Sequence, residues 1–381
     1  MKPIYFDSAA TTQVRDEVID SMIEVMKNEY GNASSTHSFG RSSKVLIEQS
    51  RKTIARYLNA SASEIIFTSG GTEADNLAIQ CAVRDLGVKH IITSKIEHHA
   101  VLHTVQQLNK AHNVKLSFVQ LNKHGEIDYD DLERLLGSES KTLVSLMHVN
   151  NEIGNILDVK RVGDLCQSYK ALFHCDAVQS IGHFKWDLQD IHIDFLAASA
   201  HKFHGPKGVG FSFIRKNTGL KPLIFGGEQE RGVRAGTEAV HNIVGLETAF
   251  QFAYDNLNHE RNYVLGLKTY FIEQLNKTIP EVSYNGLSGD LEKSTYTLVN
   301  VCLPISAEKA LMLMFQLDLK GIACSKGSAC QSGSAKGSHV LAEILETDTL
   351  TRPSVRFSFS KYNTKTEIDY LIKVLEEFVS S

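Results

Sequence analysis

Seven short apolar runs rich in β-branched residues most constrain the fold of this 381-residue chain. Amphipathic stretches, such as residues 73–84 and 97–109, lie between most of the earlier runs. Continuously apolar strands that alternate with helices favour a mostly parallel sheet covered by helices on both faces. The last two runs are joined by HKFHGPKG, which predicts a hairpin-type turn. The seven runs are residues 64–69, 90–95, 115–121, 142–149, 171–178, 193–198 and 209–214.

The pattern changes after about residue 255, where a charged helical stretch at 247–277 is followed by apolar runs at 296–303 and 354–360. Thr364 and Glu367 form a capping-box signature, which predicts a closing helix from about residue 365. This part is typical of a smaller α+β unit. We therefore expect a large domain at 14–255, and a small domain formed by 1–13 together with 256–381.

Composition excludes several classes of protein. Hydrophobic residues make up 42% and charged residues 22% of the chain, as in soluble globular proteins. The net charge of −4 argues against direct nucleic-acid binding, and no apolar run reaches the ~20 residues of a membrane span. An acid at Asp7 argues against a secretory signal. The six cysteines are scattered without a CxxC pair, so we expect reduced thiols, no metal and a cytoplasmic location.

Ligand crevices in open α/β sheets lie beyond the carboxyl ends of the strands, so the residues after each run are the first candidates. Gly70, Gly71 and Thr72 follow the first run and open a helix. Two glycines allow backbone N–H groups to approach an anion, and the helix N-terminus favours negative charge. The alternative is a simple helix cap. GK[ST] is absent, so this is not a Walker loop.

His98 and His99 follow the second run, where a flat imidazole is suited to stacking on an aromatic ring. Adjacent positions point to different helix faces, so the two histidines are not expected to share a metal ion. We expect His99 to be a surface residue. The next polar strand end is Asn150–Asn151, which either binds a ligand oxygen or builds an Asx-turn.

Asp176 ends a buried run, and a carboxylate there is costly unless it meets a cation or is structurally paired. Lys202 directly follows IDFLAASA, where partial desolvation would favour a nucleophilic amine, although a lone lysine is more often solvated. An anion cradle, a stacking histidine, a buried acid and such an amine together match the needs of pyridoxal 5′-phosphate (PLP).

A Gly/Ser-rich segment at 324–338, CSKGSACQSGSAKGS, carries Cys330. An exposed thiol on a mobile loop is a candidate nucleophile, whereas the alternative is a flexible linker with an incidental cysteine.

These segments resemble the cysteine desulfurases of the NifS/IscS type (group I), which are fold-type I PLP enzymes of the class-V aminotransferase family. The similarity runs nearly end to end and rests on ten motifs in order. They are YFDSAATT (5–12), GNASSTHSFGR (31–41), TSGGTEADN (68–76), EHHAV (97–101), HVNNEIG (148–154), HCDAVQSIG (174–182), SAHKFHGPKGVG (199–210), GGEQERGVRAGT (226–237), GSACQSGSAKGSHVL (327–341) and RFSFSKYNTKTEID (356–369).

The resemblance implies a large PLP-binding domain with a seven-stranded, mostly parallel sheet between helices, and a homodimer that transfers sulfur from L-cysteine to Cys330 and releases L-alanine. It implies catalytic roles for Cys330, Lys202 and His98, with Lys202 as the Schiff-base lysine and Arg356 and Asn151 on the substrate. Implied cofactor ligands are Gly71, Thr72, His98, Asn151, Asp176, Gln179, Ser199, His201, Lys202 and, from the partner subunit, Thr237.

The implied partners are sulfur acceptors, either an iron–sulfur scaffold or a tRNA thiolation enzyme. TEADNLAI and FGGEQER are more similar to the branch that serves tRNA thiolation. Two features depart from the family pattern: Cys324 stands where many members have an apolar residue, and the chain ends soon after its last expected helix. The alternative activities are selenocysteine lyase or another fold-type I PLP lyase or aminotransferase. An aminotransferase would not need Cys330.

Overall fold

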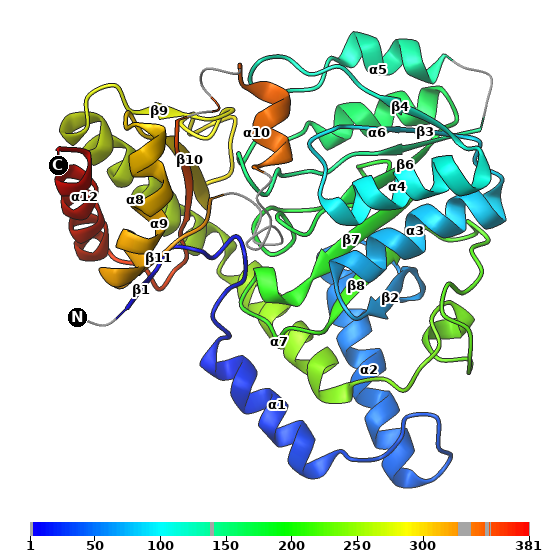
Figure 1. Cartoon of the computed structure of the whole chain (residues 1–381). Coiled ribbons are helices and arrows are strands. Elements are labelled where there is room, and N and C mark those ends of the chain that lie inside the picture. The colour runs from blue at the N-terminus through cyan, green and yellow to red at the C-terminus, as the bar shows by residue number, and fades with distance from the viewer. Residues whose placement is uncertain (1–2, 138–140, 327–336, 347–349, 351, 381) are drawn as a thin grey trace.

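The computed structural model of the chain describes residues 3–137, 141–326, 337–346, 350 and 352–380. A large sheet flanked by helices lies beside a smaller sheet with its own helices (Figure 1). The expected α/β class, with a seven-stranded and mostly parallel sheet, is confirmed.

The large sheet has the strand order β2-β8-β7-β6-β5-β3-β4. Neighbours from β7 to β4 run parallel, whereas β8 is antiparallel to both β2 and β7. All seven apolar runs form strands, and the expected reversal between the last two is confirmed. The strands are β2 (Ile65–Thr68), β3 (His90–Thr93), β4 (Lys115–Phe118), β5 (Thr142–Ser145), β6 (Leu172–Asp176), β7 (Phe195–Ser199) and β8 (Gly210–Ile214).

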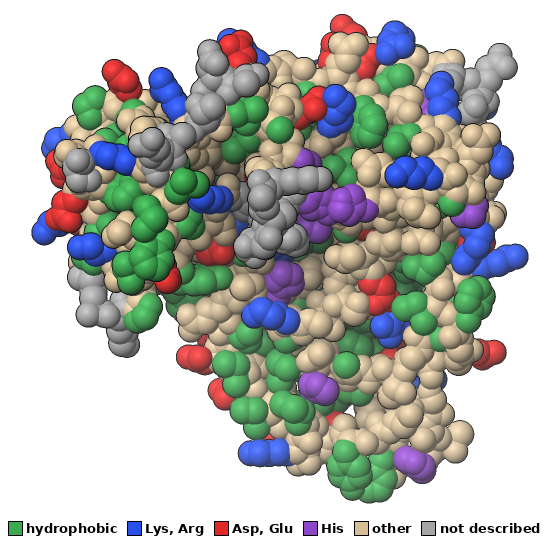
Figure 2. Space-filling view, in the orientation of Figure 1, with side chains coloured by type: hydrophobic (Ala, Val, Ile, Leu, Met, Phe, Trp, Pro, Cys, Tyr) green, Lys and Arg blue, Asp and Glu red, His purple; other side chains and the backbone are tan. Residues whose placement is uncertain are grey.

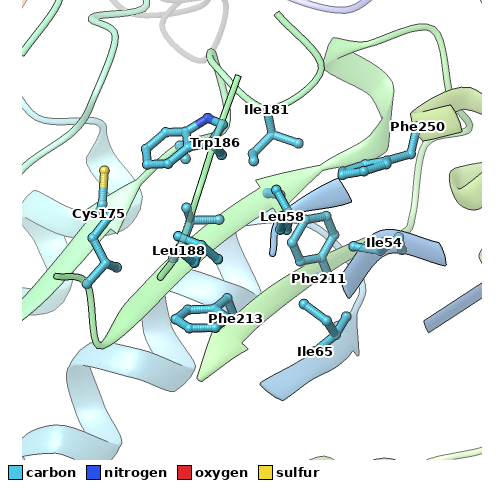
Figure 3. Close-up of a cluster of buried hydrophobic side chains, with 14 of the residues drawn as sticks. Ile54, Leu58, Ile65, Cys175, Ile181, Trp186, Leu188, Phe211, Phe213 and Phe250 are labelled. Atoms are coloured by element: carbon cyan, nitrogen blue, oxygen red, sulfur yellow. The ribbon is translucent and has the colours of Figure 1, made fainter. Parts of the chain in front are cut away.

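Helices cover both faces of this sheet, which explains why its central strands are apolar on both sides. Figure 3 shows one resulting cluster, in which Phe211 and Phe213 of β8 pack with Ile54, Trp186 and Phe250. The helices are α1 (Asp16–Asn28), α2 (Ser38–Tyr57), α3 (Gly71–Leu86), α4 (His99–His112), α5 (Tyr129–Leu136), α6 (Val159–Ser168) and α7 (Val240–Asp255), with 3₁₀ turns at Ala62–Glu64 (η1), Ala200–Lys202 (η2) and Glu230–Gly232 (η3).

The second sheet is antiparallel and buries Phe271, Phe357 and Phe359. A two-stranded parallel pair joins the N-terminal segment to this region, since Ile4 aligns with Ile322. The elements are β1 (Ile4–Tyr5), α8 (Leu257–Thr278), β9 (Ser283–Tyr284), β10 (Leu298–Cys302), α9 (Ala307–Leu319), β11 (Ile322–Ala323), α10 (His339–Ile344), β12 (Ser354–Ser358) and α12 (Lys365–Ser380). The division into domains at 13/14 and 255/256 stays a prediction.

The closing helix begins as its capping box predicts, because Thr364 N–H donates to Glu367 Oε2 at 2.9 Å and Glu367 N–H donates to Thr364 Oγ1 at 3.3 Å. The helical stretch expected at 247–277 is confirmed, with a break at one residue. The chain forms α7 and α8 there, which meet at Asn256, where φ is −106° and ψ is 9°. Within the described residues, no helix has the length and apolar character needed to cross a membrane.

Candidate active site

One pocket lies beyond the carboxyl ends of the parallel strands, where the open-sheet rule predicts a ligand. Ten of the residues proposed from the sequence line it, together with six that the sequence did not indicate. The lining consists of Ala9, Ala10, Gly71, Thr72, Asp75, His98, Met147, Val149, Asn151, Asp176, Val178, Gln179, Ser199, His201, Lys202 and Arg356.

The N-terminus of α3 forms one end of the pocket. Gly70 adopts a φ of +149°, which side chains rarely allow, and a Cβ on Gly71 would lie 2.4 Å from Val178 Cγ2. The absent side chains therefore leave the first N–H groups of a 16-residue helix accessible. The hydroxyls of Thr72 and Ser199 line the same pocket. This combination suits an anion such as a phosphate.

Asp176 ends β6 as a buried carboxyl. Its Oδ1 accepts from the N–H of Val178 at 2.9 Å. Burial raises the pKa of Asp176 to about 7; the carboxyl of Asp75 acts in the same direction, and the Lys202 ammonium opposes it. Gln179, three residues on, donates from Nε2 to the Ala9 carbonyl at 2.9 Å.

Lys202 ends the 3₁₀ turn that follows β7. Its Nζ donates to the carbonyls of Ala9 and Ala10, at 2.6 and 2.9 Å, so the N-terminal segment fixes the amine in the pocket. His201 Nδ1 lies 3.2 Å from Thr11 Oγ1. Burial, followed by the charge of Lys202, lowers the pKa of His201 to about 4, which keeps this ring neutral.

His98 is the N-cap of α4, and its Nδ1 accepts from the N–H of Ala100 at 3.1 Å. Burial and the nearby Lys202 charge lower its pKa to about 4, so the ring in the pocket is neutral. His99 points elsewhere, with its ring 4.5 Å from the ring of His339 and 4.7 Å from that of His103. Figure 2 shows histidine side chains gathered near the middle of this face.

Arg356 of β12 reaches the pocket from the smaller sheet and is 1% exposed. Its Nη1 donates to the Asn151 carbonyl at 2.6 Å, and its Nη2 lies 3.0 Å from Asp7 Oδ1. Its Nε is buried and has no hydrogen-bond partner among the described residues. A buried guanidinium with spare donors is suited to binding a carboxylate.

Two proposed residues are not part of this lining. Thr237 is exposed on the single chain and lies outside the pocket. Cys330 falls outside the described residues, as do most positions of the 324–338 segment. Cys324 is described as a free thiol, and burial raises its pKa to about 12, which disfavours the thiolate. The raised pKa favours a passive role for Cys324.

Asp75 is the most informative residue that the sequence reasoning missed. It lies three residues after Thr72 and four after Gly71, so the helical repeat places all three on one face of α3. That spacing was the available signal. In the described part of the chain, no group of three or more His, Cys, Asp or Glu side chains is placed to hold a metal ion.

The donor set fits PLP. The Gly71 cradle, which a Cβ would fill, and the neighbouring hydroxyls suit its phosphate, and the Lys202 amine suits its aldehyde. Asp176, a buried acid held by one backbone N–H, suits the pyridine nitrogen.

Comparisons with known proteins agree with this geometry. The sequence model of the class-V aminotransferases matches residues 4–371. The cysteine desulfurase IscS of Dictyoglomus turgidum is 40% identical over 380 residues, covering 99% of this chain and 95% of that protein. A solved NifS-like protein superposes with a TM-score of 0.89 at 35% identity, covering 99% of both chains. A structure of SspA in complex with cysteine gives a TM-score of 0.81 at 32% identity, covering 95% of this chain and all of that one.

These matches span nearly the whole chain at identities well above the level at which only a fold is shared. The chain therefore belongs to the class-V aminotransferase family and, within it, to the PLP-dependent cysteine desulfurases.

Proposed function

We propose that the protein takes sulfur from L-cysteine, releases L-alanine and carries the sulfur as a persulfide on Cys330. The observation that carries this proposal is the meeting of the Lys202 amine, the Asp176 carboxyl and the Arg356 guanidinium in one pocket. An amine, an acid and a carboxylate-binding cation are the groups that a PLP enzyme acting on an amino acid needs.

PLP supplies an aldehyde that condenses with amines and a ring that accepts electrons from the substrate α-carbon. The N–H groups at Gly71 and the side chains of Thr72, Ser199 and His201 would bind its phosphate. The carboxylate of Asp176 would hold the proton of the ring nitrogen, and Gln179 would bond the phenolic oxygen. Neutral His98 would pack against the ring and exclude water from it.

Lys202 would provide the amine that holds the cofactor. As a free amine, its Nζ would take the proton from the substrate α-carbon, acting as general base. Arg356 binds the substrate carboxylate through its guanidinium, and the Asn151 side chain completes the substrate contact. Because His98 Nδ1 accepts from the Ala100 N–H, the neutral ring carries its proton on Nε2, which can donate that proton and take it back.

Cys330 acts as the nucleophile in the sulfur transfer. Its thiolate attacks the substrate sulfur, an S–S bond forms, and the substrate C–S bond breaks with its electron pair returning to the carbon side. The resulting persulfide passes its outer sulfur to an acceptor protein, an iron–sulfur scaffold or a tRNA thiolation enzyme. A cytoplasmic location suits this thiol chemistry.

The active unit in this proposal is a homodimer in which Thr237 reaches the phosphate in the other subunit. Its exposure, and its position outside its own pocket, support a role across an interface. Exposed Ile19, Ile23 and Met26 repeat at helical spacing on α1, as expected for a face that a second subunit covers. Figure 2 shows hydrophobic side chains at this lower end of the molecule.

The central experiment replaces Cys330 by Ala. The visible absorption band of bound PLP should remain, whereas sulfide release from L-cysteine should be lost. Cys324→Ala is the matched control, since it removes the other cysteine of the segment and should keep turnover. Lys202→Ala should abolish the band itself. Full desulfurase turnover in the Cys330 variant would falsify the nucleophile assignment.

Mixed dimers test the role of Thr237. Three dimers are prepared: one with Lys202→Ala in both subunits, one with Thr237→Ala in both subunits, and a mixed dimer with one substitution in each subunit. If Thr237 serves the partner's site, the mixed dimer regains one intact site and its activity exceeds that of either parent. No recovery over the parents would show that Thr237 acts in its own subunit.

A further inference from the structure

Asp75 is a second carboxyl in the pocket, to which the proposed reaction gives no role. It is 1% exposed, it lines the pocket from α3, and its Oδ1 has no hydrogen-bond partner among the residues the structure describes. The atom that faces it is His174 Nε2, at 3.3 Å but without hydrogen-bond alignment. A buried carboxyl left this way is costly in its charged form.

His174 connects Asp75 to the sheet below the pocket. It lies two residues before Asp176 on β6, so both side chains point to the same face. Its Nδ1 is 2.8 Å from Ser145 Oγ on the neighbouring strand. Burial lowers the pKa of His174 to about 4, so the ring is neutral and carries one proton. His174 thus lies between Asp75 and Ser145, 3.3 Å from the carboxyl and 2.8 Å from the hydroxyl.

Asp75 and Asp176 repel each other when both are charged, and their surroundings differ. Asp176 accepts from the N–H of Val178 and faces the Lys202 ammonium. For Asp75, burial is the cause that raises its pKa well above the usual range. Glu97 is a third buried carboxyl nearby; its Oε1 accepts from the Met147 N–H at 2.9 Å, and its pKa is also raised by burial. When buried carboxyl groups lie close together, the negative charge resides on the one whose ionised form is best stabilised by hydrogen bonds and nearby cations.

We propose that Asp75 is a positioning residue that stays protonated and thereby assigns the single negative charge of the Asp75–Asp176 pair to Asp176. The inference rests on the proposed function, since it concerns the acid that holds the ring nitrogen. If Asp75 were ionised, its charge would favour protonation of Asp176. Asp176 would then be a neutral acid, although a carboxylate is needed to hold the proton of the ring nitrogen. A protonated Asp75 lies 3.3 Å from His174 Nε2 without placing a second charge in the pocket, and His174 is held from its other side by Ser145 Oγ, 2.8 Å from Nδ1.

The test compares infrared spectra of the wild-type holoenzyme and the Asp75→Asn holoenzyme at neutral pH. A protonated Asp75 contributes a carboxylic-acid C=O band, which Asp75→Asn removes. Bands of the cofactor and of Glu97 cancel in the difference spectrum, because both proteins retain them. The proposal would be overturned if the variant lost a carboxylate band, or if it lost no carboxyl band at all. This result does not depend on which substrate the enzyme turns over.

A pH titration gives a second readout, which reports whether Asp75 carries a charge. Asp75→Asn changes no net charge if Asp75 is protonated, so the midpoint of the cofactor's absorption change with pH should stay in place. If Asp75 were ionised, loss of its charge would shift that midpoint downward by about one pH unit or more. Such a shift would overturn the proposal.

Asp75→Leu has a similar shape but offers no partner to His174. We expect its PLP dissociation constant to rise about tenfold, which is about 1.4 kcal/mol, while Asp75→Asn stays near wild type. Equal affinity in the two variants would contradict the positioning role. If the Leu variant does not fold, the infrared and titration results on Asp75→Asn decide the question alone. Sulfide release is measured separately, so failure of the desulfurase assignment is distinguishable from failure of this inference.

Discussion

Arg356 Nη2 and Asp7 Oδ1 lie 3.0 Å apart, joining a strand near the C-terminus to a residue near the N-terminus. Ser325 Oγ donates to the same carboxylate oxygen at 2.8 Å, and the backbones of Ser325 and Arg356 exchange hydrogen bonds of 3.3 and 2.7 Å. The residue proposed to bind the substrate carboxylate is therefore fixed by the stem of the segment that carries Cys330.

Asp7→Ala should raise the KM for L-cysteine about tenfold while changing kcat much less. The substitution leaves the buried Arg356 without its charged partner and removes the contact that holds its guanidinium in position. Asp7→Asn keeps an oxygen acceptor, so its effect should be smaller. Steady-state kinetics measure both, and a KM below that of the wild type in the Ala variant would contradict the argument.

Gly71→Ala should weaken PLP binding, because the new Cβ would lie 2.4 Å from Val178 Cγ2 and the stiff valine must move. Combining it with Val178→Ala should restore part of the affinity. Gly266→Ala is the control, since a Cβ there meets nothing within 4 Å inside α8; it should stabilise the protein by about 0.5–1 kcal/mol. Cofactor titration and thermal unfolding give the two measurements. Failure of the second substitution to relieve the first would rule out the steric explanation.

Glu230→Gln should lower the free energy of unfolding by about 3–5 kcal/mol, as breaking a buried ion pair usually does. Arg51 and Glu230 are each 2% exposed and pair through two contacts of 2.7 and 2.8 Å. Glu230 Oε2 also accepts from the Phe67 N–H at 2.7 Å, so the pair ties α2 and β2 to the segment that precedes Thr237. Denaturant unfolding measures the loss. A decrease below 1 kcal/mol would mean that water reaches the pair.

His148→Phe should make the free energy of unfolding less sensitive to acid pH. The ring is buried between Phe184 and Trp186, with centroids 5.3 and 4.8 Å away, and burial lowers its pKa from 6.5 to about 4. In that window the unfolded chain binds a proton that the folded chain does not, so stability is lost as pH falls from 6.5 towards 4.

Removing His148 should reduce the slope of the unfolding free energy against pH by up to about 1.4 kcal/mol per pH unit within that window. The control is His112→Phe at an exposed position of α4, which should leave the slope unchanged. Unfolding measured at several pH values decides the matter. An unaltered slope for His148→Phe would show that the folded protein accepts a proton there.

The large sheet was predictable because most of its strands are short apolar runs that can be buried on both faces. The strand pairs β1–β11 and β9–β10 were not, because two-residue strands such as Ile4–Tyr5 carry no periodicity. The break between α7 and α8 has neither Gly nor Pro to mark it, since the chain reads Asp-Asn-Leu at 255–257.

Much of the pocket followed from one rule, that ligands bind beyond the carboxyl ends of parallel strands. Asp176 and Lys202 satisfied it directly. Arg356 instead entered through family resemblance, because its place depends on how the smaller sheet packs against the large one. Asp7 was missed since its importance arises from a contact with Arg356, distant in sequence, which no local pattern encodes. Asp75 was missed although its helical spacing from Gly71 places it on the same face of α3.

The N-terminal strand has a consequence for synthesis on the ribosome. Ile4 has its partner at Ile322, and the Ala9 N–H donates to Ser358 Oγ at 2.8 Å, so the segment that contains Ala9 is held by residues synthesised much later. Ala9 and Ala10 also supply the carbonyls that hold Lys202. A nascent chain thus cannot finish its pocket until Ser358 has been translated, and a product terminated before that point lacks the contacts that set the amine in place.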